Sequence, residues 1–288
     1  MSMVTDHAVL AESAYWQILR PGHALTDGHV ALRLNVGAAI DDPQVAADLL
    51  HTYRTTCAGL RAVLGCDGFG VSFAWSWVPA GDGIGEPRAE WGQPAIHVFG
   101  RTPNERVKPV RVMAQPVHAR PAAMRPSERT RLDRRLAGAF AAHADGAPRP
   151  DSDPNPAGCD GCGPEVARDQ ELWRADGVRV IRPRAPLTEA NVLVLPMRHV
   201  VSPASLRPAE VVSYAERLRE VRAHFGDRFG ATGLSCFLND GARAGQETPH
   251  VHVHVFGRSA DEPRNPFEVL ARRIGVVRES RPGSYRLS

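Results

Sequence analysis

The chain has 288 residues, of which 43% are hydrophobic and 23% are charged. This composition is typical of a soluble globular protein with room for two ordinary domains or one large one. The formal net charge is only +3, and the basic residues are almost all arginine, with Lys108 as the single lysine. So small a charge gives no support for a nucleic-acid-binding or lipid-binding surface, and we expect neither kind of partner.

The N-terminal region carries no basic stretch followed by an apolar core, and no apolar run is long enough to span a bilayer. Five cysteines are a sparse and odd set, which disfavours a disulfide framework. These features predict a protein of the reducing cytoplasm. The cysteines stand at positions 57, 66, 159, 162 and 236.

The first hundred residues predict a strand, a helix, a strand, a loop and a strand. The segment ILRPGHALTDGHVALRL starts at Ile18 and contains an apolar strand. Apolar residues at spacings of three and four then predict a helix between Pro43 and Gly65. A strand-like run, GVSFAWSW, starts at Gly70, and a Gly-rich loop leads from it to the strand HVFGR at 97–101.

Proline, arginine and alanine recur in the middle of the chain, and this composition predicts a linker over 102–158. Within it, the stretch SERTRLDRRLAGAFAAHA (127–144) predicts a short helix with Ser127 as its N-cap. We expect the charged face of this helix to be solvated.

The second half repeats the order of the first. The segment VIRPRAPLTEANVLVLP from Val180 resembles the one that starts at Ile18, and HVFGR recurs at 254–258. Between them lie a predicted helix from Pro208 to Phe225, ended by Gly226, and a strand-like run, GLSCFLN. The repeated order indicates internal duplication. We therefore predict an α+β fold of two tandem units, residues 1–101 and 159–288, joined by the linker 102–158.

Three histidines stand at alternate positions in PHVHVHVFGR, which runs from 249 to 258. Alternation at period two is typical of a strand, so the histidines should share one face and the valines the other. We expect the valines to be buried against the helix that starts at Pro208. The histidine face has three interpretations: a solvated surface, a metal site only, or a chemical site. A row of imidazoles can supply a nucleophile, a proton carrier and a phosphate donor together.

The stretch NDGARAGQETPHVHVHVFGR resembles the signature of the histidine triad (HIT) superfamily, in which His-φ-His-φ-His-φ-φ follows a Gly-rich loop. The upstream NVLVLPMRHV (191–200) resembles the family's preceding strand and turn. Two units in one chain are similar to the arrangement in galactose-1-phosphate uridylyltransferase and in dinucleoside polyphosphate phosphorylases. The resemblance implies antiparallel sheets with packed helices, joined as an intramolecular pseudo-dimer, so the chain is expected to be a monomer.

The resemblance also implies roles for particular residues. His252 matches the family's nucleophile, which forms a covalent phosphoramidate at the α-phosphorus of a nucleotide or nucleoside phosphate. His254 matches the residue that binds a phosphate oxygen and supports charge in the transition state. The preceding loop is expected to supply the other phosphate contacts, which are Asn239, Gly245, Gln246 and Thr248.

The type of reaction has three candidates. A histidine at the third triad position, here His254, is usual in hydrolases and phosphoramidases of the family, whereas uridylyltransferases commonly carry glutamine there. The tandem arrangement favours nucleotidyl transfer or phosphorolysis instead. A non-catalytic nucleotide-binding module is the third candidate.

Three positions depart from the family pattern. Glu247 stands where hydrolases often have a small hydroxyl residue, unless the loop is shifted and Thr248 supplies that hydroxyl. The acidic residue that commonly holds the ribose diol has no counterpart in the stretch Arg182-Pro183-Arg184. The first half has no triad, because its aligned positions are Gln93, Ala95 and His97. We therefore interpret the first half as a degenerate partner, and His23, His29 and His97 as ordinary surface or core histidines.

The motif CDGC at 159–162 is ambiguous between a redox pair and a metal site. The resemblance implies a structural zinc ion bound by Cys159, Cys162, His199 and His250, and two thiolates with two imidazoles suit tetrahedral zinc. A vestigial cysteine pair and a redox pair are the alternatives. The remaining cysteines, Cys57, Cys66 and Cys236, are expected to be buried small residues.

Overall fold

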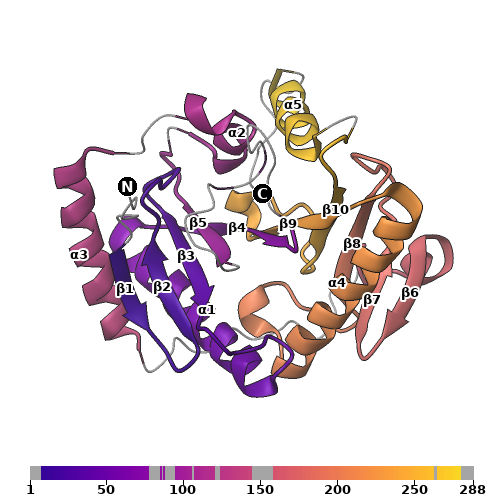
Figure 1. Ribbon diagram of the computed structural model, residues 1–288, viewed down its shortest axis with the longest axis horizontal. Coiled ribbons are helices and arrows are strands. Elements are labelled where there is room, and N and C mark those ends of the chain that lie inside the picture. The colour runs from indigo at the N-terminus through magenta and orange to yellow at the C-terminus, as the bar shows by residue number, and fades with distance from the viewer. Residues whose placement is uncertain are drawn as a thin grey trace.

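The computed structural model describes residues 8–77, 85, 87, 95–105, 107–120, 124–144, 158–262 and 265–279. These residues form a ten-stranded antiparallel sheet with helices on both faces (Figure 1). Gln93, most of the predicted Gly-rich loop of the first half and the end of the predicted linker lie outside the described residues. Within the described part of the chain, no helix combines the length and apolar character that a bilayer crossing requires.

Each half supplies five consecutive strands to the sheet, whose order is β1-β2-β3-β5-β4-β9-β10-β8-β7-β6. The strands of the first half are β1 (Ala8–Glu12), β2 (Trp16–Arg20), β3 (His29–Leu34), β4 (Gly68–Trp75) and β5 (Ala95–Arg101). Those of the second half are β6 (Glu171–Ala175), β7 (Val178–Ile181), β8 (Asn191–Pro196), β9 (Gly233–Asp240) and β10 (Val253–Arg258).

The sheet has a pseudo-two-fold relation between its halves. The order of the second half reverses that of the first, and the equivalent strands β4 and β9 pair antiparallel at the centre, from Phe69 opposite Asp240 to Trp75 opposite Leu234. Strands β5 and β10 then occupy equivalent places on either side of that pair. The predicted intramolecular pseudo-dimer is therefore confirmed.

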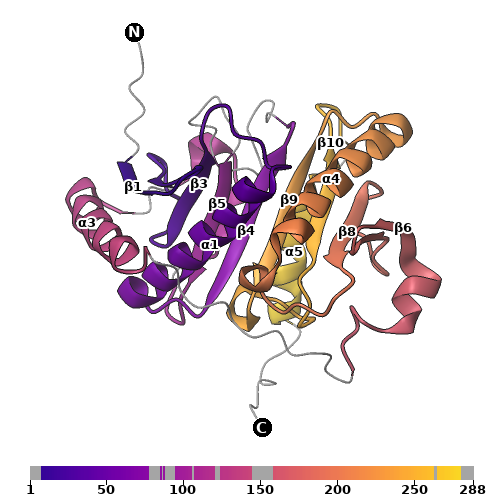
Figure 2. The same cartoon turned by 90° about the horizontal axis from the view of Figure 1, so that it is seen from below.

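Two equivalent 22-residue helices, α1 (Pro43–Leu64) and α4 (Pro208–Phe229), lie side by side over one face of the sheet (Figure 2). Both begin with a proline in the first turn, where its fixed φ suits a helix, and both end at a glycine in the left-handed region. The bounds of α1 agree with the prediction. The predicted end of α4 at Gly226 is wrong, because a glycine inside a helix costs only about 1 kcal/mol and the left-handed cap, φ 66°, is formed by Gly230.

The core runs without interruption through both halves. Val251, Val253 and Val255 are buried as predicted, and β10 packs against α4. Their core cluster continues across the central strand pair to Phe69 and Val71 of the first half. Cys57, Cys66 and Cys236 are buried, as predicted, and none of the five cysteines is in a disulfide.

The described part of the predicted linker is mostly helical. It contains α2 (Pro109–Met113), the 3₁₀ turn η1 (Val117–Ala119) and α3 (Pro126–Ala142). Helix α3 packs on α1 and β1, and its Leu132, Leu136 and Phe140 are buried.

Two details of the prediction for this helix are wrong. Pro126 takes the first helical position, so Arg125 is the N-cap in place of Ser127. Its charged side chains are not all solvated, because Asp133 is buried with one oxygen 3.4 Å from Nε of Arg20, a fully buried arginine whose charge needs a carboxylate partner.

The opposite face of the sheet carries α2 and α5 (Pro266–Glu279), which contact each other (Figure 1). Phe267 of α5 is fully buried in a cluster with Phe99 and Met113. The C-terminal helix of the second half therefore covers part of the first half. The remaining short elements are the π-helical turn η2 (Val166–Gln170) and the 3₁₀ turns η3 (Pro203–Ser205) and η4 (Ala242–Ala244).

Because the two halves share one sheet and one core, residues 159–288 expressed alone should self-associate or aggregate. The fragment would expose the edge of β9, which pairs with β4 along seven residue pairs in the whole chain. Light scattering of the fragment and of the full chain would measure the difference. A stable monomeric fragment with normal activity would contradict the pairing role of the first half.

Candidate active site and metal centre

The histidine segment is extended, but only its last part belongs to the sheet. Strand β10 starts at Val253, and before it the backbone N–H of Val251 donates to the carbonyl of Val200 at 2.6 Å. The prediction that all three histidines lie on one strand is therefore wrong for His250 and His252. The predicted alternation of side chains between two faces still holds, because the valines are buried in the core while His252 and His254 are only partly buried.

The orientation of His252 is set by its own backbone. Its Nδ1 lies 2.8 Å from the carbonyl oxygen of His250. A carbonyl can only accept, so Nδ1 carries the hydrogen and Nε2 is left with a free lone pair. Burial lowers the pKa of His252, which favours the neutral ring at pH 7. This is the state that a nitrogen nucleophile requires.

His254 lies next to His252, with 5.2 Å between the ring centroids. Burial lowers its pKa to about 3, so the ring is neutral at physiological pH. Within the described part of the chain, Nδ1 of His254 is buried and has no hydrogen-bond partner. A buried polar atom without a partner is rare and is compatible with a group that meets a ligand.

The loop before the histidines is closed by hydrogen bonds from its own side chains. Gly241 and Gly245 have φ of 88° and 99°, in the region that favours glycine. Asn239 donates through Nδ2 to the carbonyl of Gly245 at 3.2 Å. Gln246 accepts from the N–H of Gly241 at 2.7 Å and donates to the carbonyl of Val201 at 2.8 Å. Both ends of the Gln246 amide therefore hold the loop.

Thr248, the last of the predicted phosphate contacts, and its neighbour Glu247 belong to the same loop. Thr248 is half-buried, and its carbonyl accepts from the N–H of His250 at 2.7 Å. Glu247 is exposed, and its negative charge raises the pKa of His252, against the larger effect of burial. These loop residues adjoin the triad, and their contacts with a phosphate remain predictions.

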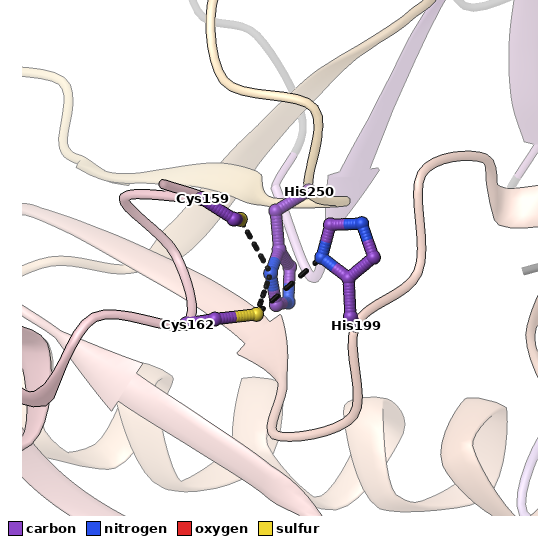
Figure 3. Close-up of side chains that lie close together, drawn as sticks. All are labelled: Cys159, Cys162, His199 and His250. Carbon is purple, nitrogen blue, oxygen red and sulfur yellow. Dashed lines mark hydrogen bonds between the residues drawn. The ribbon is translucent and has the colours of Figure 1, made fainter. Parts of the chain in front are cut away.

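Cys159, Cys162, His199 and His250 come from three separate segments and lie together, with one ligand atom of each within 4.8 Å of the others (Figure 3). Nδ1 of His250 is 3.6 Å from Sγ of Cys159 and 3.4 Å from Sγ of Cys162, and Nδ1 of His199 is 3.4 Å from Sγ of Cys162. A tetrahedral zinc ion with Zn–S bonds of about 2.3 Å and Zn–N bonds of about 2.0–2.1 Å places S and N about 3.6 Å apart. The four side chains therefore fit zinc.

A second contact orients one of these ligands. Nε2 of His250 is 2.8 Å from the carbonyl oxygen of Pro196, so it carries the hydrogen and leaves Nδ1 free to bind a metal. Burial also lowers the pKa of His250 to about 4, which keeps the ring neutral. The set has four protein ligands and leaves no open position, as in structural zinc sites.

The family model described as "HIT domain" matches residues 165–261, which include His199, the Gly-rich loop and the three histidines. Residues 165–261 form a HIT domain. The bis(5'-nucleosyl)-tetraphosphatase [asymmetrical] of Schizosaccharomyces pombe is 36% identical over 73 residues, which are 25% of this chain and 40% of that protein. The bifunctional bis(5'-adenosyl)-triphosphatase/adenylylsulfatase of Arabidopsis thaliana is 32% identical over 77 residues, 27% of this chain and 43% of that protein. The chain thus spans less than half the length of either relative.

A solved structure, described as a GalT-like protein from Arabidopsis thaliana, superposes over most of the chain. It covers 85% of this chain and 74% of its own length, with 9% sequence identity and a TM-score of 0.47.

Side chains of the first half hold the loop of the HIT domain. Tyr53 donates to Asp240 at 2.7 Å, and Arg243 forms an ion pair with Asp67 at 3.0 Å. Gly68 lies so close to the loop that an added Cβ would be 2.8 Å from the backbone nitrogen of Ala244. No local sequence pattern marks these residues, because the partners are 176 or more residues apart in the chain.

In the first half, alanine stands at the position equivalent to His252. Ala95 begins β5, and the equivalent of His254, His97, is buried with Nδ1 3.0 Å from Nε2 of His29. His29 also accepts the N–H of Leu25 through Nδ1 at 3.0 Å. In the HIT domain Asn191 accepts the N–H of Leu187 in the same way, at 3.1 Å. His29 and His97 are therefore structural, as predicted.

Buried neutral histidines should make the fold sensitive to acid. Burial lowers the pKa of His97 to about 3 and that of His29 well below its usual value, whereas an unfolded histidine titrates near pH 6.5. Between about pH 6.5 and 3 the unfolded chain binds protons that the folded chain does not. The folded state therefore keeps its full stability with respect to these two histidines above pH 6.5, and it loses stability as the pH falls below that value.

We expect the free energy of unfolding to decrease below pH 6.5 by up to about 1.4 kcal/mol per pH unit for each such histidine. Urea denaturation between pH 7.5 and 4.5 would measure this slope, and His97→Gln should reduce it. A stability that is flat over this range would contradict the prediction.

Proposed function

We propose that the chain is an enzyme that cleaves a nucleotide or nucleoside phosphate at its α-phosphorus through a covalent intermediate on His252, with hydrolysis or phosphoramidate cleavage as its reaction. The observation that carries the proposal is the 2.8 Å hydrogen bond from Nδ1 of His252 to the carbonyl of His250. It holds the ring in the tautomer whose Nε2 lone pair is free to attack phosphorus.

The proposed reaction has two displacements. The Nε2 lone pair forms the N–P bond while the bond from the α-phosphorus to the leaving oxygen or nitrogen breaks, and the leaving group takes that electron pair. Water then forms a new P–O bond as the N–P bond breaks, which returns the electron pair to Nε2. One proton of the attacking water goes to solvent and replaces the proton that the leaving group takes up from solvent, and the other stays on the new phosphate oxygen until it ionises. We propose that His254 contacts a phosphate oxygen and that the backbone at Gly245, whose φ is 99°, lets an anion approach closely.

The histidine face offers an apolar surface for the nucleoside. Leu193 of β8 lies directly opposite His254 in the sheet and is half-buried. It packs against a small cluster that includes Ile181 and Leu195. We propose that a base or sugar rests on this surface while the phosphate faces the triad. The relatives reported above, named as a tetraphosphatase and a triphosphatase, support a nucleotide as the substrate.

Zinc is proposed to bind at Cys159, Cys162, His199 and His250 and to stabilise the fold. The zinc ion would fix the start of the histidine segment. The side chain of His250 would bind the ion, and its backbone carbonyl accepts the hydrogen bond that orients His252. A closed four-ligand site supplies no position for substrate, so the ion takes no part in the proposed chemistry.

Nucleotidyl transfer or phosphorolysis is the second candidate. The ten-stranded sheet of two tandem units supports it, since this is the arrangement that the resemblance to uridylyltransferases implied. In that case phosphate or another acceptor replaces water in the second displacement. We also propose the unit boundaries 1–101, 102–158 and 159–288, a monomeric state and a cytoplasmic location, which suits the free thiols of the metal site.

The test is turnover of a panel that contains dinucleoside polyphosphates, nucleoside phosphoramidates and nucleoside diphosphate sugars, with and without orthophosphate. Turnover in water alone would support hydrolysis. Turnover that requires orthophosphate would support phosphorolysis and exclude the first candidate. Binding without turnover of any compound would contradict the enzyme proposal and leave the nucleotide-binding module.

A further inference from the structure

An apolar cavity lies between the two long helices and the sheet. Its volume is about 530 Å³, within the range of roughly 300–1,000 Å³ that is typical of small-molecule sites. Both halves line it, and their contributions include Leu49 of α1, Ile96 of β5 and Leu218 of α4. The cavity opens to solvent on one side, which gives a ligand a way in.

This cavity is separate from the triad. It is lined by Val251 and Val253, whose side chains point to the opposite face from His252 and His254. The cavity therefore lies on the face of the sheet that α1 and α4 cover, and the triad lies on the other face.

The shape of the cavity limits the length of a ligand. On α4 its lining runs from Val211 to Arg222. The eleven steps from Val211 to Arg222 correspond to about 16 Å at a rise of 1.5 Å per residue. With C–C bonds of about 1.5 Å, an extended chain of about ten carbons fits within that span.

The charged lining residues are arginines on α4, Arg219 and Arg222. Both are exposed to solvent, so they lie at the mouth. Arg219 forms an ion pair with Asp41 at 2.7 Å, which joins α4 to the segment before α1. The guanidinium of Arg222 donates to the carbonyl of Thr232 at 3.5 Å. Within the described residues it has no carboxylate partner. An anionic group at the mouth would supply that partner.

We propose that this cavity binds an aliphatic carboxylate of about ten carbons, with the chain against the apolar lining and the carboxylate beside Arg222. The chain would leave water for an apolar surface, which is the driving force for binding. The positive charge at the mouth selects an anionic head group over a cationic one. The site is independent of the proposed phosphate chemistry.

The test is isothermal titration of the full chain with sodium decanoate and, separately, with decyltrimethylammonium, both below the concentrations at which they form micelles. Saturable binding of one decanoate per chain, tighter than that of the cation, is expected. Arg222→Glu should weaken decanoate binding about fivefold or more and strengthen binding of the cation. Arg228→Glu makes the same change of charge on an exposed part of α4 outside the cavity and should leave both affinities unchanged.

A second variant, Leu49→Trp, places a larger side chain in the cavity and should weaken binding of both amphiphiles. The proposal is overturned if decanoate does not saturate, if the two amphiphiles bind equally, or if Arg222→Glu and Arg228→Glu have equal effects. Unchanged decanoate affinity in Leu49→Trp would place the binding outside the cavity and would also overturn it.

Discussion

His252→Ala is expected to lower kcat by at least about three orders of magnitude while substrate binding stays close to that of the wild type. Alanine removes the nitrogen whose lone pair would form the bond to phosphorus. The loop residues that would bind the phosphate remain, because Gln246 and Asn239 hold that loop through backbone groups and not through His252. Single-turnover kinetics with the best substrate of the panel, together with its Kd, would measure the two effects separately.

The same experiment has a direct chemical readout. Rapid acid-free quenching of the wild type during turnover should trap a nucleotidyl group on His252, visible by mass spectrometry of the peptide. His51→Ala is the matched control, since His51 is a half-buried histidine of α1 on the other face of the sheet. If His252→Ala retained a tenth of the wild-type activity, His252 could not be the nucleophile.

Removal of the metal should have the second large effect, on stability. Structural zinc sites contribute several kcal/mol or more of folding free energy, so chelation should lower the Tm by about 10 °C or more. Metal analysis should find about one zinc per chain in the protein as purified. Cys162→Ala and His199→Ala should each lower the zinc content and the Tm, because each removes one of four ligands.

Restoration provides the control for this prediction. Zn²⁺ added back to the chelated protein should recover the original Tm, whereas Mg²⁺ should not, because it prefers oxygen ligands to thiolate and imidazole. A zinc-free protein with an unchanged Tm would contradict a structural role for the four residues.

Local sequence indicated the central strands and the long helix of each half, and their repetition. The alternation of histidine and valine predicted which side chains enter the core, because neighbouring residues of an extended chain point to opposite faces. Pro43 and Gly65 predicted the two ends of α1, because each residue has a backbone preference that suits its end of a helix. The prediction failed at Gly226, where α4 continues for three residues and the cap falls on Gly230.

The resemblance to a known family supplied the four expected metal ligands and the expected roles of the triad. The tertiary structure decided whether the ligands could meet. His199 follows β8 and His250 precedes β10, and the antiparallel pairing of these two strands brings both histidines to the same end of the sheet. Cys162 lies 88 residues before His250 in the chain, yet its Sγ is 3.4 Å from Nδ1 of His250 in the fold. The tautomer of His252 was also decided by the folded structure, because the backbone conformation at His250 sets the position of the carbonyl that accepts its hydrogen bond.

Contacts between the halves lay beyond any sequence pattern. Tyr53 belongs to the apolar stripe of α1, yet its hydroxyl bonds to Asp240 at the end of β9, 187 residues later. The cavity behind the triad likewise needs both long helices and the joined sheet. Backbone preference and periodicity act over a few neighbouring residues, so the sequence by itself indicated three strands and the long helix of each half. The resemblance marked Ala95 as the position that lacks the histidine. The distances across the pseudo-two-fold axis depend on how the surfaces of the two halves pack together, and only the folded chain decides them.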